Sequence, residues 1–196
     1  MSGPTTDGRR LKGQRRRRAL VDATIRVIGR SGVAGVSQRV VAVEADVPPS
    51  AVPYYFPSVD DLLLAALVDV NDDYIAAVAR CAADPDPLAA LSALVARAGD
   101  GPVRSSTTAE FELFLLTRRG GPWQHQYERW SDALTRFFAP RVAGPERAAA
   151  ASAVVDGLFL RCYCRPGTLD AAAVRGIVGT TLGEPPHPRA MSENRL

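Results

Sequence analysis

The chain has few cysteines and histidines and no long apolar run, and these absences exclude several classes of protein. Its three cysteines, Cys81, Cys162 and Cys164, are an odd number without paired spacing, which predicts free thiols in a reducing compartment. The longest apolar run, residues 62–68, is far shorter than the ~20 residues that span a bilayer, and no apolar segment follows the N-terminal arginines as it would in a signal peptide. The sequence therefore predicts a cytoplasmic protein with no membrane partner.

Residue patterns that support catalysis or metal binding are also missing. The only histidines are His125 and His187, and Cys162 and Cys164 stand at i and i+2 of an expected helix, where they point to nearly opposite sides. No serine-hydrolase, zinc-protease or paired-carboxylate motif is present. We therefore expect no catalytic residue, no metal site and no cofactor.

Positive charge is concentrated at one end of the chain. Residues 1–39 carry ten arginines or lysines against two acids, so this segment has a net charge of +8 while the remaining 157 residues have −5. A basic end on an acidic body indicates a polyanionic partner at that end, either nucleic acid or an anionic membrane surface. A solvated basic tail without a partner is the simpler alternative that charge alone leaves open.

Apolar residues recur at helical spacing along most of the chain, and no alternating strand pattern of useful length is present. We expect a flexible basic arm over 1–13 and a disordered tail over 184–196. The expected helices lie at about 14–30, directly after Ser37, near Pro48 or Pro49, and at about 58–82, 87–98, 104–119, 122–142, 145–164 and 168–183. The fold class is therefore all-α with about nine helices.

The segment VVAVEADVPPSAVPYYF has the spacing of a helix-turn-helix. Ala42 is small where the two helices touch, and Asp46 stands at the tight turn, where it is one of the few residue types besides glycine that tolerate a left-handed backbone. Pro48 and Pro49 mark the start of the second helix. Pro53 falls at about the fifth position of that helix, where its missing N–H is expected to remove a backbone hydrogen bond and to kink the helix.

Around this segment the chain resembles the DNA-binding domain of the TetR family of one-component transcriptional regulators. The match runs without a gap through RRRRALVDATIRVIGRSGVAGVSQRVVAVEADVPPSAVPYYFPSVDDLL, which has the family's basic start, first-helix pattern, turn and recognition helix in register. The chain departs from the family pattern at four positions: Asp46 replaces the turn glycine, Pro48 the N-cap serine, Pro53 a DNA-facing tyrosine and Val59 a phosphate-binding lysine. The resemblance implies an operator-binding helix-turn-helix domain over 14–57 and a helical body over 58–183 that binds an effector and forms the dimer.

The basic cluster and the outer face of the second helix together supply the expected DNA contacts. Arginines contact phosphates, whereas short side chains on the recognition helix let its backbone come close to the bases. The predicted DNA-binding residues are Arg15, Arg16, Arg17, Arg18, Ser37, Gln38, Arg39, Pro49, Ser50, Ala51, Tyr54 and Tyr55.

An aromatic stripe farther along the chain has two interpretations. At helical spacing it is first of all part of a core, but aromatic residues with a few polar groups also line small-molecule sites. The residues of a predicted effector site are Glu110, Phe111, Phe114, Thr117, Trp123, Tyr127 and Trp130. The family has no shared pocket motif, so the resemblance implies an effector without identifying these residues.

The helix at 145–164 has apolar residues over adjoining faces, which predicts a surface wide enough for both the chain's own core and a second subunit. The predicted dimerisation residues are Val154, Val155, Leu158, Phe159 and Cys162.

These patterns lead to one functional hypothesis and two rivals. We predict a homodimeric repressor that binds a palindromic double-stranded operator and is released by an unknown small-molecule effector. The alternative is a basic amphipathic protein that binds RNA or an anionic membrane, which only the arginine cluster supports. An enzyme built on a buried acid such as Glu110 or Asp156 lacks a partner base in the sequence.

Overall fold

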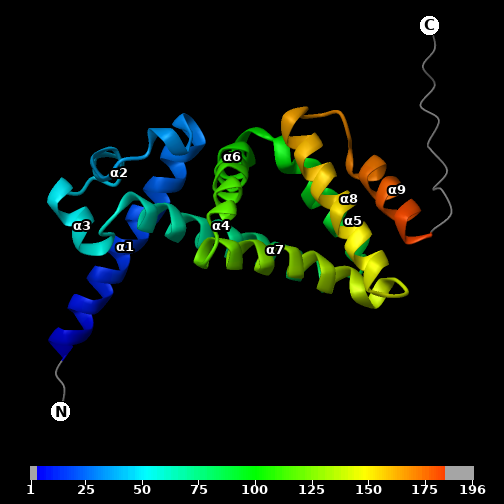
Figure 1. Cartoon of the computed structure of the whole chain (residues 1–196), viewed down its shortest axis with the longest axis horizontal. Coiled ribbons are helices and arrows are strands. Elements are labelled where there is room, and N and C mark those ends of the chain that lie inside the picture. Colours follow the sequence, from blue (N-terminus) through cyan, green and yellow to red (C-terminus); the bar gives the residue numbers. More distant parts are fainter. Residues whose placement is uncertain (1–3, 184–196) are drawn as a thin grey trace, which may run out of the picture. The chain divides into compact units, whose positions relative to one another are not determined.

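The structure, a computed structural model, describes residues 4–183, with side chains for residues 8, 10–100 and 107–183 (Figure 1). Within this range it contains nine α-helices and no strand, which confirms the all-α prediction. The helices are α1 (Pro4–Ser31), α2 (Gln38–Glu44), α3 (Val52–Tyr55), α4 (Val59–Ala82), α5 (Pro87–Ala96), α6 (Gly101–Leu115), α7 (Pro122–Phe138), α8 (Pro145–Cys164) and α9 (Ala171–Leu182). None of the described helices is long and apolar enough to cross a membrane.

The chain folds into two compact units, and each combines separate stretches of sequence. Within the described residues, the first unit comprises 4–76 and 100–130, and the second comprises 77–99 and 131–183. The first unit includes α6 because α6 packs along α1. The packing boundary therefore differs from the functional boundary expected after residue 57, which remains a prediction.

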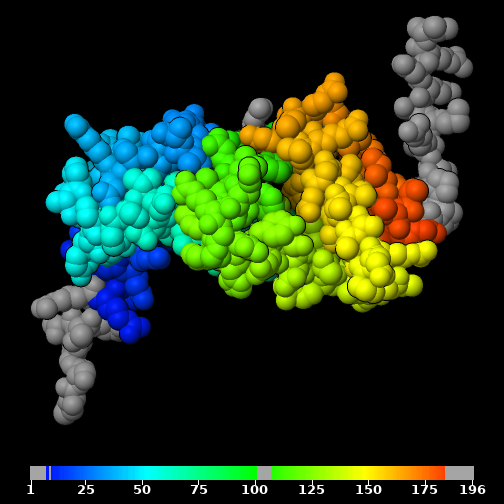
Figure 2. Space-filling model, in the orientation of Figure 1, coloured from blue at the N-terminus to red at the C-terminus, as the bar shows by residue number. Residues whose placement is uncertain are grey.

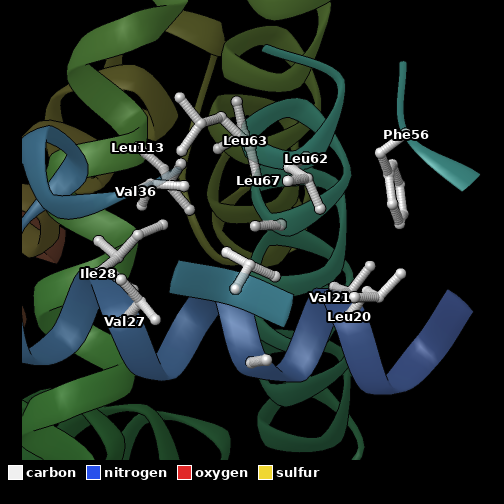
Figure 3. Close-up of a cluster of buried hydrophobic side chains, with 14 of the residues drawn as sticks. Leu20, Val21, Val27, Ile28, Val36, Phe56, Leu62, Leu63, Leu67 and Leu113 are labelled. Atoms are coloured by element: carbon white, nitrogen blue, oxygen red, sulfur yellow. The ribbon is translucent and has the colours of Figure 1, made fainter. Parts of the chain in front are cut away.

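The core of the first unit joins α1, α2, α4 and α6 (Figure 3). Leu20 and Ile28 of α1 are fully buried, and they meet Leu62 of α4 and Leu113 of α6, which are also fully buried. Burying one such side chain contributes about 1.5–3 kcal/mol relative to leaving it in water. The helical spacing of these apolar residues therefore determines which face of α1 points inward.

The first helix begins at Pro4 rather than at Gln14, so from Pro4 onward the segment expected to be a flexible arm is helical. Proline is favourable in the first turn because its missing N–H has no helical acceptor, and the arginines and Lys12 that follow are good helix formers. The segment has no apolar periodicity, which is why the sequence pattern does not reveal this part of the helix. Residues 1–3 and the tail predicted over 184–196 lie outside the described residues.

In the second unit, α5, α8 and α9 pack against one another. Their contact is apolar, with Leu91, Val155 and Val174 at most 1% exposed. Asp86 caps α5 and also forms an ion pair with Arg175 of α9, with 2.7 Å between Asp86 Oδ1 and Arg175 Nη1. Apolar burial and this ion pair therefore hold α9 on α5.

Candidate DNA-binding surface

The turn between α2 and α3 has the geometry that the sequence predicts. Ser37 caps α2 by accepting a hydrogen bond from the backbone N–H of Val40 at 3.2 Å. Asp46 has φ +53°, the one positive φ outside glycine among the described residues. The N–H of Val47 then donates to the carbonyl of Ala42 at 3.0 Å, which ends α2 in a Schellman motif. The left-handed backbone predicted at Asp46 is confirmed.

The recognition segment is a 3-10 turn followed by the short helix α3, rather than one continuous helix. Pro53 therefore lies in the first turn of α3, where a backbone N–H has no helical acceptor. The backbone bonds on either side are intact: Ala51 N donates to Pro48 O at 2.9 Å, and Phe56 N donates to Val52 O at 2.8 Å. The expectation that Pro53 removes a helical hydrogen bond is wrong, because the change of helix type places it at a helix start.

The side chains of this segment separate into a buried and an exposed face. Val52 and Phe56 are 0% and 2% exposed and belong to the core of the first unit. The exposed face carries Pro48, Pro49, Ser50, Pro53 and Tyr54. Ala51 and Tyr55 are half-buried, and the Tyr55 ring packs edge-on against Tyr54 with ring centroids 5.0 Å apart. In Figure 2 this cyan segment forms part of the molecular surface near the blue turns of α1.

The arginines predicted to bind phosphate divide into two groups. Those at 15–17 are exposed, and none of them forms an ion pair with another residue in the described part of the chain. Arg18 instead bonds to Asp69 of α4 and to Asp22, with 2.8 Å between Arg18 Nε and Asp22 Oδ1. Arg15 and Arg16 therefore remain available to a ligand. The Arg17 guanidinium lies over the Phe56 ring, 4.9 Å from its centroid, and Arg18 joins α1 to α4.

A groove of ≈450 Å³ lies between the N-terminal turns of α1 and the two tyrosines of α3. Its lining residues are Arg10, Lys12, Gly13, Gln14, Arg16, Arg17, Tyr54 and Tyr55. Cationic side chains and tyrosine hydroxyls donate hydrogen bonds to phosphate oxygens, so this groove suits the backbone of a nucleic acid. A neighbouring groove of ≈590 Å³ has aspartates of α4 on one side, at 61, 69 and 72, and these repel phosphate.

The three predicted contact residues at the start of α2 differ in what they can reach. Ser37 is engaged in the cap of α2, although its hydroxyl proton remains free to be donated. The Gln38 amide donates to the carbonyls of Phe56 at 2.9 Å and Pro57 at 3.2 Å. Arg39 is exposed and belongs to no ion pair among the described residues. Gln38 therefore ties the end of α3 to α2, and Arg39 is the side chain here that can extend to DNA.

A charge cluster that sequence reasoning missed holds α2 on α1. Glu44 bonds Arg26, with 2.6 Å from Oε1 to Nε, and Arg30, with 2.5 Å from Oε2 to Nη2. The hydrogen bonds from Arg30 and Arg26 hold the pKa of Glu44 at about 2, below its ordinary value of 4.5. The i, i+4 spacing of the two arginines is the signal that places them on one face of α1.

The residues predicted to bind an effector lie on or just beside α6 and α7, in the first unit. The Phe114 ring packs edge-on against Trp130 with centroids 4.0 Å apart and lies 5.6 Å from the Tyr127 ring centroid. Trp130 Nε1 is buried and has no hydrogen-bond partner among the described residues. The Thr117 hydroxyl donates to the Phe114 carbonyl at 2.7 Å, and Trp123 is buried in the core. Glu110 and Phe111, the other two predicted effector residues, are half-buried on α6.

Most of the residues predicted to form the dimer interface are buried within the second unit. Val155, Leu158, Phe159 and Cys162 are at most 8% exposed, and Val154 is half-buried. These side chains therefore pack mainly within the chain's own core, and their part in a dimer remains a prediction. The exposed side of α8 carries a different set, which includes Ala153, Asp156, Gly157 and Leu160.

Together these features define a class of protein. A small all-α chain whose helix-turn-helix shares one exposed surface with a basic helix has the form of a DNA-binding transcriptional regulator. Residues 20–66 match the family model described as "Bacterial regulatory proteins, tetR family". The chain is also 32% identical over 169 residues to the HTH-type transcriptional regulator BetI of Burkholderia ambifaria, covering 81% of this chain and 87% of that protein. The chain therefore belongs to the TetR family of transcriptional regulators.

Solved structures agree with this assignment. A TetR-family member from Streptomyces coelicolor superposes with a TM-score of 0.73 at 32% identity, covering 85% of this chain and 97% of that one. The multidrug binding protein EbrR, in complex with imidazole, superposes with a TM-score of 0.71 at 31% identity, covering 87% of this chain and 96% of that one. Other EbrR structures are complexes with ethidium, malachite green and proflavin.

Proposed function

We propose that the chain is a dimeric repressor that binds a palindromic operator through residues 14–57 and is released by a small-molecule effector held within 58–183. The observation that carries the proposal is the exposed face of the recognition segment beside a groove lined by four cations. A helix in the major groove contacts bases while neighbouring cations contact the flanking phosphates, so one surface supplies both kinds of contact. Family membership favours this function over the alternative of an RNA-binding or membrane-binding protein.

The test is selection of duplexes from a random library of about 30 base pairs, long enough for two half-sites one helical turn apart. Ser50→Glu places a carboxylate on the exposed recognition face and should weaken the selected duplex at least about 30-fold, the cost of an unpaired charge in an interface. Ala83→Glu, at an exposed position just after α4, adds the same charge as a matched control and should bind like the wild-type chain. Equal affinity of both variants would place the DNA contacts elsewhere.

The dimer is proposed to form through the exposed side of α8 together with α9. Leu160 is 49% exposed on α8 and Ile177 is 41% exposed on α9, which leaves apolar surface for a second copy. Leu160→Asp should therefore produce a folded monomer by light scattering and circular dichroism. Leu158→Asp should instead unfold the second unit, because Leu158 is 6% exposed and its carboxylate would be buried. A folded, dimeric Leu160→Asp variant would move the interface to another surface.

We infer that the effector is an aromatic cation. The cluster of Phe114, Tyr127 and Trp130 offers aromatic faces, residues 40–196 have a net charge of −5, and the related EbrR binds ethidium, malachite green and proflavin. Malachite green is the probe: it should quench tryptophan fluorescence and lower DNA affinity, and Phe114→Ala should weaken its binding. Leu115→Ala, on the same helix but 68% exposed, is the control.

Thermodynamic linkage makes this test sharper. A ligand that weakens DNA binding must itself bind less well to the DNA-bound protein, by the same factor. Titrating malachite green into the free protein and into its complex with the selected duplex measures that factor. Equal affinities in the two titrations would mean that the dye binds without acting as an effector.

A further inference from the structure

The exposed recognition face is nearly devoid of hydrogen-bonding groups. Its exposed residues are Pro48, Pro49, Ser50, Pro53 and Tyr54. A proline has neither a polar side chain nor a backbone N–H, so three of the five positions lack every donor. The backbone N–H of Ala51 is engaged with Pro48 O at 2.9 Å. Hydroxyls of a serine and a tyrosine are the only side-chain polar atoms left on this face.

The long polar side chains of α2 nearest this face, Gln38 and Glu44, bond other residues of the first unit. The Gln38 amide donates to the carbonyls of Phe56 and Pro57, and Glu44 bonds Arg26 and Arg30. Bidentate recognition of guanine or adenine needs a free Arg, Lys, Asn or Gln on the recognition helix, and this segment has none. Hydroxyls donate and accept equally well, so they discriminate weakly between base pairs.

An apolar face in the major groove favours one base edge over the others. The 5-methyl group of thymine is the largest apolar group among the base edges displayed there. A proline ring against an amino group or a ring nitrogen would remove water from that polar atom without replacing its hydrogen bond. Pro49 and Pro53 stand four residues apart and are both exposed, Pro49 at the start of the 3-10 turn and Pro53 in the first turn of α3.

We propose that Pro49 and Pro53 determine the operator sequence by packing against thymine methyl groups in each half-site. This inference rests on the proposed function, since it names what the DNA-binding surface recognises. Arginines of α1 and Arg39 supply sequence-independent phosphate contacts, while the two prolines select thymine and exclude bases that present only polar edges.

The experiment uses the full chain and the duplex selected from the random library. Each thymine is replaced in turn by deoxyuridine, which removes the methyl group and leaves the hydrogen-bonding edge unchanged. Losing one buried methyl should lower affinity about fourfold per half-site, so symmetric replacement in both half-sites should lower it about 15-fold. Replacing the same thymine–adenine pair by 5-methylcytosine–guanine keeps the methyl group and should lower affinity less than replacement by unmethylated cytosine–guanine.

Variants assign the methyl contact to a residue. In Pro53→Ala and Pro49→Ala, deoxyuridine at the contacted position should no longer reduce affinity, because the proline ring that packs on the methyl group is absent; Leu115→Ala should keep the full reduction. The wild-type measurement needs no variant, so it stands even where a proline variant fails to fold.

The outcomes separate this inference from the proposed function. If no duplex is enriched, specific DNA binding itself is wrong. If a duplex is enriched and deoxyuridine has no effect at any position, the chain binds DNA but does not recognise thymine methyl groups. If deoxyuridine lowers affinity equally in the wild-type chain and in folded proline variants, another residue contacts the methyl group and the assignment to the prolines is overturned.

Discussion

Replacing the arginines at 15–17 by alanine tests how the basic helix contributes to DNA binding. These side chains are exposed and lie on α1, where Arg16 and Arg17 line the groove beside Tyr54. Removing an arginine that neutralises one phosphate should reduce the slope of log affinity against log salt by about 0.9, so the triple variant should reduce it by about 2.7 per bound subunit. Across the fourfold range from about 50 to about 200 mM salt, a slope smaller by about 2.7 corresponds to about a 40-fold smaller drop in affinity.

Arg18→Ala is the matched control, because it removes an arginine from the same helix that is already paired with Asp22 and Asp69. It should leave the salt slope near the wild-type value. Fluorescence anisotropy of a labelled selected duplex, titrated at several salt concentrations, measures both slopes. The reasoning would be refuted by a triple variant whose slope is unchanged, or by an Arg18→Ala variant whose slope falls as far as expected for one neutralised phosphate.

Three further predictions concern stability measured by urea unfolding. Asp46→Ala should destabilise the chain by about 1 kcal/mol because alanine tolerates φ +53° poorly, whereas Asp46→Gly should not; similar destabilisation in both would assign the effect to the aspartate side chain. The pKa of Glu44 is lowered to about 2 in the folded chain, so its ion pairs stabilise the fold fully above the ordinary pKa of 4.5, and this stabilisation is lost as pH falls toward 2. Glu44→Gln should therefore lose less stability than the wild-type chain between pH 4.5 and pH 2. An equal loss in both chains would contradict the ion pairs. Partial desolvation raises the pKa of Asp156 from 3.8 to about 6, so the wild-type chain loses stability as pH rises through this window. Solvent still reaches part of this residue and screens the effect, so Asp156→Asn should be more stable at pH 7 by no more than about 1 kcal/mol, and equally stable near pH 3.

Features that depend only on residues close together in the sequence could be predicted from it. The start of a helix directly after Ser37 and the left-handed turn at Asp46 follow from the chemistry of one or two residues, and the structure has both. The apolar spacing in α1 predicts its buried face for a similar reason, since the 3.6-residue repeat aligns Leu20 and Ile28 on one side. Local spacing of this kind also determines the all-α class.

Tertiary structure decided which polar groups remain free to contact a ligand. Four consecutive arginines have the same chemistry, yet Arg18 alone reaches Asp69, which stands 51 residues farther along the chain. Gln38 looks like a base-reading side chain in the sequence, and the fold engages it with Phe56 O and Pro57 O.

The division of α8 into an inner and an outer side was likewise decided by packing. Apolar residues cover adjoining faces of this helix, so the sequence alone does not say which face meets the chain's own core. In the second unit, where α8 packs against α5 and α9, Leu158 is buried and Leu160 is exposed. Helical periodicity by itself determined that α8 is amphipathic, whereas its orientation depended on partners distant in sequence, because side-chain burial is a property of the packed elements and not of one helix.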